Sequence, residues 1–426
     1  MKNHSTKVFF NAKIKRASGK IEEIKQDFGN VEVTKLFAEV KDSNGNLKER
    51  KELPFDSYLK AVPYLINYLL TGESNSGKLL NTSGLAISND IFQMKLNEGE
   101  ILEGNTEGSL FGLNFGDLHN DTGKFPNPIS GIGNNVNISD YALKNELTRS
   151  QIVSTGSTSG YNIDAVNIAV DTNKIKISRN IENADASSVL VLSEIGLTGK
   201  FGTDPKDSIQ LTRDSIGTEI CDAGELYYCL KMNPGDNLTI FYEITVSANS
   251  GFKTNYLKML ESLFTGQAVS SCKADDGAVI QTDYNDNTNV SIMAPANEKY
   301  FGLVLGGKKN KIPSGIPNIL PNTCVFNELI GDLTLRPVKS NQVALYETGS
   351  VFTVGRKFEN NTQDTFYVNH AGIIAQYDDG VVDGDVTLFD LPIKSDSANY
   401  IILHPLDILE LNLNFVYPVG TMEVDY

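Results

Sequence analysis

Short runs of alternating apolar and polar residues dominate the chain between Ile175 and Val246. Three runs share this pattern, with apolar positions at Ile175, Ile177 and Ile181; at Val189, Val191 and Ile195; and at Leu238, Ile240, Tyr242, Ile244 and Val246. Because successive side chains of a strand point to opposite faces of its sheet, period two predicts half-buried strands. Pro234-Gly235-Asp236 predicts the turn that leads into the last of them.

A second region, between Val351 and Val416, repeats the order of these features. Arg179–Asn183 (RNIEN) matches Arg356–Asn360 (RKFEN) at an offset of 356 − 179 = 177. Pro234-Gly-Asp matches Pro405-Leu-Asp at an offset of 405 − 234 = 171. Because these landmarks keep their order while the offset changes slowly, we interpret the chain as a tandem duplication.

Apolar residues at helical spacing precede each β region. Phe55–Gly72 and Thr254–Gly266 both have this spacing, which predicts one short helix before each region. With Tyr58 aligned on Tyr256, the second helix is shorter by four residues (14 − 10), which is close to one helical turn. A glycine-rich β segment follows each helix, at Ser109–Gly116 and at Lys299–Gly306.

The start of the chain predicts a separate small β element. Val8–Lys15 and Val31–Val40 alternate as strands do, and Asn44-Gly45 suits a type I′ hairpin turn. We therefore expect a mainly β protein of two tandem antiparallel β-sandwich modules, jelly-roll-like, each with one short preceding helix. The expected boundaries are 1–52 for the N-terminal β element, 53–250 for the first module and 251–426 for the second.

The composition is that of a globular protein with an acidic excess. Hydrophobic residues make up 40% and charged residues 21% of the 426 residues, and the formal net charge is −16. Nucleic acids and anionic membranes both attract basic surfaces, so we expect neither as a partner. No apolar run approaches the ~20 residues of a membrane span, and no secretory signal is expected. The cysteines lack zinc-type spacing and are expected to be reduced thiols: Cys221, Cys229, Cys272 and Cys324.

Motifs that would indicate catalysis are incomplete in this sequence. Gly72–Leu79 has the G-x-x-x-x-G-K of a phosphate-binding loop, but Leu79 stands where the magnesium-binding Ser or Thr belongs. Asp283–Thr288 lacks the glycine of a calcium loop, and Asp378–Asp385 is either a cation site or a solvated acidic turn. The four histidines form no zinc or general-base motif. We therefore predict a protein without catalytic residues, bound cofactor or metal, and not an enzyme.

Two arginines open the repeated signature and are the leading site candidates. Arg179 and Arg356 would either fork onto loop carbonyls or a carboxylate within the fold, or anchor a subunit interface. Gly196 and Gly372, each after an apolar strand, predict a β-bulge or a close backbone approach. The full set of structural or interface candidates is Arg179, Asn183, Glu194, Gly196, Arg356, Asn360 and Gly372.

The order of these motifs resembles a module of tailed-bacteriophage virion proteins. The resemblance rests on Arg179–Asn183, Glu194–Leu197, Leu211–Asp214 and Pro234–Thr245, with the upstream stretch Gly131–Leu147. The second copy departs from it, because Asn369-His-Ala-Gly replaces the E-x-G-L context and Leu388-Phe-Asp replaces L-x-R.

This resemblance implies a structural component of a virion, assembled in the host cytoplasm, in a tail, neck-ring or fibre-attachment role. Head decoration and a carbohydrate-binding or receptor-binding surface protein are the alternatives. The implied partners are other virion proteins and further copies of the chain in an oligomer or ring, with a host glycan as a further possibility. The long loops Asn97–Asn137 and Lys308–Asn322 are the predicted contact surfaces.

Overall fold

The computed structural model describes the chain in segments, and nearly all of its elements are antiparallel strands. The longest described stretches are 5–53, 167–184, 230–248, 250–265, 302–315, 349–378, 383–395 and 398–417. Shorter pieces are 58–59, 61–62, 84, 112–116, 119–120, 127–128, 161–163, 186–187, 189–192, 194–200, 208–215, 219–220, 226–227, 272–273, 279–280, 289–291, 330–331, 333–335 and 339–346. The predicted mainly β class with antiparallel sheets is confirmed.

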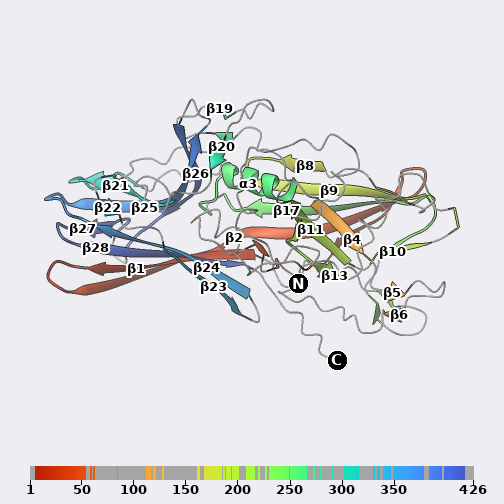
Figure 1. Cartoon of the computed structure of the whole chain (residues 1–426), viewed down its shortest axis with the longest axis horizontal. Coiled ribbons are helices and arrows are strands. Elements are labelled where there is room, and N and C mark those ends of the chain that lie inside the picture. The colour runs from red at the N-terminus through yellow and green to blue at the C-terminus, as the bar shows by residue number, and fades with distance from the viewer. Residues whose placement is uncertain are drawn as a thin grey trace.

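An eleven-stranded antiparallel sheet runs the length of the molecule (Figure 1). In sheet order its path is β22 (Thr334–Leu335), β24 (Gly349–Glu359), β28 (Ile408–Tyr417), β1 (Ser5–Lys15), β2 (Ile21–Lys41), β17 (Asn237–Val246), β9 (Lys174–Asn183) and β7 (Tyr161–Ile163). Three strands pair beside this path: β23 (Lys339–Tyr346) with β24, β3 (Leu47–Leu53) with β2, and β8 (Asn167–Val170) with β9.

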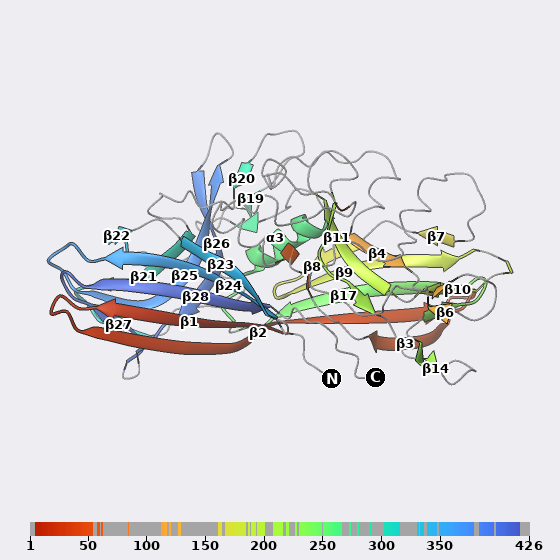
Figure 2. The ribbon, with the colours of Figure 1, turned by 60° about the horizontal axis from the view of Figure 1, so that its bottom comes forward.

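The long strand β2 joins the two halves of this sheet. Its first part, from Ile21 to Val33, pairs with β1 in a hairpin, and its second part, from Glu32 to Lys41, pairs with β17, so the two pairings overlap at Glu32 and Val33. Figure 2 shows the β1–β2 hairpin at one end of the molecule and β2 continuing to the other end. The predicted strands Val8–Lys15 and Val31–Val40 are therefore present, but they lie at the centre of the sheet, and β2 already begins at Ile21.

Two smaller sheets and one helix cover a single face of the large sheet. The first has five strands: β20 (Asn289–Ser291), β21 (Gly302–Lys309), β25 (Phe366–Asp378), β26 (Asp383–Pro392) and β27 (Ile401–Leu403). The second has four: β4 (Gly112–Gly116), β11 (Glu194–Lys200), β12 (Ser208–Gln210) and β13 (Asp214–Ser215). The helix α3 (Thr254–Thr265) contacts both β11 and β26, so it bridges the two smaller sheets.

Four two-stranded ladders complete the described elements. They are β5 (His119–Asn120) with β6 (Asn127–Pro128), β10 (Leu190–Leu192) with β16 (Leu230–Met232), β14 (Glu219–Ile220) with β15 (Leu226–Tyr227), and β18 (Cys272–Lys273) with β19 (Val279–Ile280).

The alternation read from the sequence separates a buried face from a charged face. The buried face includes Val8, Phe10 and Ile14 of β1, Ile175, Ile177 and Ile181 of β9, Leu238, Ile240, Tyr242, Ile244 and Val246 of β17, and Leu409, Leu411 and Leu413 of β28. The residues between them, such as Lys13 and Glu410, are exposed. Each buried Leu, Ile or Phe stabilises the fold by about 1.5–3 kcal/mol, so this face drives the pairing of the layers.

The two halves of the large sheet have the same strand register. Arg179 lies opposite Ile240 in the β9–β17 ladder, and Arg356 lies opposite Leu411 in the β24–β28 ladder. The offsets, 356 − 179 = 177 and 411 − 240 = 171, are those of the sequence landmarks. Each matched residue therefore faces a matched residue across the ladder.

The strand β1 and the second part of β2 also correspond to each other, at an offset of 26 residues that was not found from the sequence. Lys15 lies opposite Ile408, and Lys41 lies opposite Asn237, which gives 41 − 15 = 26 and again 408 − 237 = 171. The hairpin turns match as well, because Gly19 and Gly45 have φ angles of 85° and 83°. The stretch Lys15–Gly19 and its counterpart Lys41–Gly45 were the available signal.

Two local predictions were wrong. Val189, Val191 and Ile195 do not share one strand, because β10 pairs with β16, β11 pairs with β4, and Val189 is 49% exposed. The chain changes sheets between β10 and β11, so its alternation does not continue through this point.

The two segments that precede the repeats align differently from the prediction. The Leu59 amide donates to the Leu211 carbonyl as the Lys253 amide donates to the Leu388 carbonyl, so the offset is 253 − 59 = 194. At this offset Gly72 falls on Gly266, and the four-residue difference in length disappears. The helix expected over Thr254–Gly266 is present as α3, whereas that expected over Phe55–Gly72 lies mostly outside the described residues.

Replacing Gly306 with Ala should strongly destabilise the fold. A Cβ at this position of β21 would lie 1.7 Å from Nε2 of the buried His370 ring, so the β21–β25 ladder or the ring must move. We expect a loss of about 1–3 kcal/mol in the free energy of unfolding, measured by chemical denaturation. In a double-mutant cycle with His370→Ala, the cost of Gly306→Ala should shrink, and an equal cost in both backgrounds would contradict the packing argument.

Candidate functional site

Thr6 and Glu32 mark the centre of the large sheet, where they lie opposite each other in the β1–β2 ladder. The offset that relates β1 to the second part of β2 also carries Thr6 onto Glu32, because 32 − 6 = 26. Since β1 and β2 are antiparallel, an approximate two-fold axis between the two halves of the sheet passes between these two residues. We call this axis the pseudo-dyad.

Glu32 on the pseudo-dyad is a buried carboxyl group, only 1% exposed, that is held by hydroxyl groups. Its Oε1 accepts hydrogen bonds from Thr6 Oγ1 at 3.0 Å and from Tyr58 Oη at 3.2 Å. Its Oε2 accepts one from Tyr256 Oη of α3 at 3.3 Å. Tyr417 at the end of β28 packs edge-on against Tyr58, with 6.0 Å between the ring centroids. Residues from both halves of the chain therefore meet at Glu32.

Burial sets the protonation behaviour of this cluster. It raises the pKa of Glu32, and the hydrogen bonds from Thr6, Tyr256 and Tyr58 only partly offset that effect. Burial, followed by the charge of Glu32, raises the pKa values of Tyr58 and Tyr256, so both hydroxyls remain donors. The cluster can hold a proton in the core, because Thr6, Glu32, Tyr58, Tyr256 and Tyr417 are all buried.

The two signature arginines lie in the buried layer between the sheets. Arg179 is 1% exposed and Arg356 is 3% exposed. Nη1 of Arg356 donates a hydrogen bond of 2.9 Å to the carbonyl of Leu303 on β21, and burial lowers the pKa of Arg356 to about 10. The carbonyl belongs to a strand and not to a loop, and the bond ties β24 to the facing sheet.

The two signature asparagines, Asn183 and Asn360, close matching turns. The amide of Asn183 donates to the carbonyl of Asp236, and the amide of Asn360 donates to that of Asp407, both at 2.9 Å. Nδ2 of Asn183 donates to the carbonyl of Met232, and Nδ2 of Asn360 donates to that of Leu403, so each side chain binds the strand before its turn. Both asparagines are buried, and we interpret them as residues that shape these turns.

Each turn aspartate is clamped by a cation from the N-terminal hairpins. Lys48 of β3 lies 2.8 Å from both carboxylate oxygens of Asp236. Arg16, after β1, lies 2.6 Å from Oδ2 of Asp407 and also donates to the carbonyl of Ile402. The carboxylates further accept the backbone amides of Asn233 and His404, each at 2.9 Å. Charge-assisted bonds of this kind make both turns rigid.

Glu194 belongs to a buried ion pair, and in the other half of the molecule the acidic and the basic residue of the matching pair have changed places. Nε of Arg213 donates to Oε2 of Glu194 at 2.9 Å, with both side chains fully buried. At the matched positions, 194 + 176 = 370 and 213 + 177 = 390, Nδ1 of His370 lies 3.0 Å from Oδ1 of Asp390. The acidic partner has moved from β11 in one half to β26 in the other, while the position of the pair is retained.

The glycines Gly196 and Gly372 occupy matched ladder positions. Gly196 lies opposite Asn114 and Gly372 lies opposite Val304, at offsets of 176 and 190. Gly196 sits in an unbroken β4–β11 ladder, but on the other side of β11 the register shifts by one residue between the Ile195–Asp214 pair and the Thr198–Gln210 pair. Beside Gly372 the register shift of the β25–β26 ladder falls one residue later, between Ile373 and Ile374.

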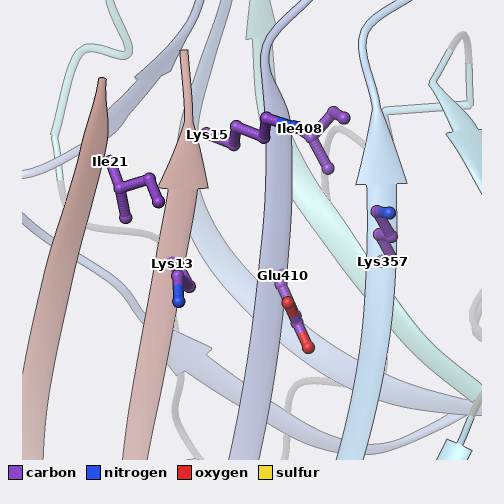
Figure 3. Close-up of a pocket in the computed structure, with 6 residues that line it drawn as sticks. All are labelled: Lys13, Lys15, Ile21, Lys357, Ile408 and Glu410. Carbon is purple, nitrogen blue, oxygen red and sulfur yellow. The ribbon is translucent and has the colours of Figure 1, made fainter. Parts of the chain in front are cut away.

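A shallow hollow lies on the outer face of the large sheet, near the tip of the β1–β2 hairpin (Figure 3). Its lining residues are Lys13, Lys15, Ile21, Lys357, Ile408 and Glu410. The surface here is open and basic, without convergent catalytic groups among the residues shown.

The described residues contain neither a cluster of metal ligands nor a membrane-spanning helix. No group of three or more His, Cys, Asp or Glu in the described part of the chain is close enough to hold a metal ion. Among the helices within the described ranges, none has the length and apolar character to cross a membrane. The phosphate-loop candidate Gly72–Leu79, the calcium-loop candidate Asp283–Thr288 and the loop Asn97–Asn137 lie outside the described residues, apart from short pieces of the last.

Comparisons with known proteins do not place the chain in a family. No protein family, no curated protein and no solved structure matches it.

Several residues of the site were missed by sequence reasoning. Thr6, Glu32 and Arg16 fell in the segment interpreted as a separate β element, so their partners in distant parts of the chain were not expected. One signal was available, because Glu32 is in phase with Leu36, Ala38 and Val40 and so falls on the apolar face of the predicted strand. A carboxyl on a buried face needs hydrogen-bond partners, and tyrosine-rich segments are natural suppliers.

Replacing Asn360 with Ala should destabilise the chain by about 1–3 kcal/mol, because the buried carbonyl of Leu403 and the amide of Thr362 each lose a partner. The neighbouring Asn361→Ala removes an exposed bond to Thr334 and should change the free energy of unfolding by less than about 0.5 kcal/mol. Urea denaturation of both variants checks the difference. Equal effects would show that the turn does not depend on Asn360.

Replacing Glu32 with Gln should remove a pH dependence of stability. A carboxyl with a raised pKa in the folded chain stabilises the fold fully below its unfolded pKa, near 4.5, and this contribution is lost as pH rises through the folded pKa. We therefore expect the wild-type melting temperature to fall as pH rises above about 4.5. Glu32→Gln should flatten this fall and be more stable than wild type by about 1–3 kcal/mol at pH 8.

The matched control for this measurement is Glu49→Gln, at an exposed position of β3. It should leave the wild-type pH profile unchanged. Parallel profiles for wild type and Glu32→Gln would show that Glu32 does not titrate with folding.

Proposed function

We propose that this chain is a structural component of a tailed-phage virion, in a tail, neck-ring or fibre-attachment position, and that it acts through protein–protein contacts. We further propose that it consists of a duplicated β-sandwich module with a preceding helix. In this proposal it has no catalytic turnover, and its partners are other virion proteins and further copies of itself in an oligomer or ring. Assembly takes place in the host cytoplasm.

The observation that carries this proposal is the shared register of the two halves. Three residue pairs of the signature keep their places: Arg179 and Arg356 in β9 and β24, Asn183 and Asn360 in the turns, and Gly196 and Gly372 in the facing sheets. A register that coincides across several ladders supports common descent of the halves more strongly than the sequence landmarks alone. The signature of the phage resemblance is then the internal framework of a repeated module.

The burial of the signature residues indicates that they stabilise the fold, whereas exposed residues make the contacts with other chains. Arg179, Asn183, Glu194, Arg356 and Asn360 are each at most 3% exposed. Their contacts hold the fold, so the exposed ends, edges and loops remain for contacts with other chains. This distribution suits an assembly protein, whose specificity lies in its surface.

Head decoration and binding of a host glycan or receptor remain the alternatives to a tail or neck role. Carbohydrate and other ligand sites use accessible aromatic side chains. Tyr58, Tyr242, Tyr256 and Tyr417 are all buried in the core. These tyrosines therefore lend no support to the glycan alternative.

Mass spectrometry of gradient-purified phage particles tests the proposal. We expect the chain at a fixed copy number per particle, and immunogold labelling should place it at the tail or neck. The same gradient fractions from uninfected host cells are the control. Its absence from infectious particles, or robust hydrolysis of a polysaccharide or nucleotide by the purified chain, would overturn the proposal.

A further inference from the structure

We propose that the two ends of the molecule are complementary docking surfaces, through which copies of this chain join end to end. The Arg16 end comprises residues 15–23, 308–312, 359–365 and 404–408. The Asp42 end comprises residues 41–49, 182–184, 189 and 233–237. This inference rests on the proposed role only in assuming action through protein contacts, and the partner it names is a second copy of the chain.

The ends are matched in structure because the pseudo-dyad exchanges them. Arg16 and Asp42 occupy equivalent positions after β1 and β2, as 42 − 16 = 26. The turn at Leu406 matches the turn at Gly235, since 406 − 235 = 171. Figures 1 and 2 show these turns at opposite ends of an elongated molecule. Two ends with equivalent turns but different surface chemistry allow a chain of identical subunits.

All the large apolar side chains that are exposed among the described residues lie at these two ends. The Arg16 end has Ile21, Ile312 and Leu406, which are 53%, 55% and 66% exposed. The Asp42 end has Leu47 and Val189, which are 56% and 49% exposed. Single exposed apolar residues are common on protein surfaces, but here the five fall on two small areas that match each other.

Leu406 combines high exposure with an unusual backbone conformation. Its φ angle is +66°, whereas Gly235 at the matched turn has a φ angle of +80°. Glycine adopts this left-handed conformation without penalty, but leucine is strained there by about 1–2 kcal/mol. An exposed leucine that is strained and unneeded for the turn points to a contact outside the chain, because strain persists where function uses it.

The charges of the ends have opposite sign. The Arg16 end has six basic residues and five acidic ones, 6 − 5 = +1, in a chain whose net charge is −16. The Asp42 end has two basic residues and four acidic ones, 2 − 4 = −2. The basic hollow of Figure 3 adjoins the Arg16 end and adds Lys13 and Lys357 against Glu410. The Arg16 end of one copy therefore complements the Asp42 end of the next.

Rigid turns favour such a contact, since little entropy is lost on binding. Arg16 forms an ion pair with Asp407 in the turn that carries Leu406, and Lys48 forms one with Asp236 in the matching turn at Gly235. These ion pairs hold the turn at each end in place before binding. The segment 308–312 is attached to the segment 359–365 of the same end, because the Asn310 amide donates a hydrogen bond of 2.7 Å to the Thr365 carbonyl.

Sedimentation velocity of the full chain tests the inference. We expect concentration-dependent association at about 20 mM salt that weakens at about 500 mM salt, because exposed charges are screened. Leu406→Gly should leave the melting temperature unchanged or raise it, while weakening association at least about tenfold. A monomer at every concentration in low salt would overturn the inference, as would association that Leu406→Gly leaves unchanged.

Charge reversal gives a matched pair of variants. Lys20→Glu with Lys311→Glu reverses the Arg16 end, and Asn46→Lys with Glu49→Lys reverses the Asp42 end, all at exposed positions. Each double variant should lose self-association alone, and an equal mixture should regain it, because every contact again joins opposite charges. Failure of the mixture to recover would place the contact elsewhere on the chain or with a different protein. These results do not depend on finding the chain in virions, so the two proposals can fail separately.

Discussion

The strand β2 pairs with β1 over its first part and with β17 over its second part, so a single strand sets the register of both halves of the molecule. A slip of one residue in such a strand would turn its buried face to solvent. Slipping β2 would therefore expose the cores of both halves together. The hairpin turns at Arg16–Lys20 and Asp42–Asn46 fix the register at the two ends, and the Thr6–Glu32 pair fixes it at the centre.

Placing a carboxyl group at this centre is costly, because a buried ionised group must be compensated by hydrogen bonds or neutralised. Glu32 is compensated by hydroxyls from β1, from the segment before the first repeat and from α3. An apolar residue there would pack with less penalty but would not distinguish one arrangement of these segments from another. We interpret the polar cluster as a device that orients Tyr58 and Tyr256 about the pseudo-dyad, in the way single buried polar groups fix register elsewhere.

Much of the fold could be predicted from the sequence where the signal was local. The alternation in β9 and β17, the turn at Pro234, the helix at Thr254 and the match of Arg179 to Arg356 were all readable from short windows. The central position of β1 and β2 could not be read in this way, because strand pairing across several hundred residues leaves no local trace. The two segments before the β regions were aligned wrongly, with Tyr58 on Tyr256, because these two residues are identical. The backbone hydrogen bonds show that Tyr58 corresponds to Phe252.

Comparison of the matched halves shows which positions keep the same backbone geometry although their side chains differ. The turn that leads into β17 uses Gly235 and the turn that leads into β28 uses Leu406, yet both carry the same hydrogen bonds. The buried pair Arg213–Glu194 becomes Asp390–His370 with its acidic partner on the other strand. At such positions the geometry tolerates an exchange of chemistry, provided that each buried charge keeps a partner. Arg16 and Asp42 are partly buried on equivalent turns and carry opposite charges, and each has its own partners, Asp407 and Glu22 for Arg16 and Asn46 for Asp42. Under the proposed duplication, divergence of this kind gives the molecule two different ends without any change in fold.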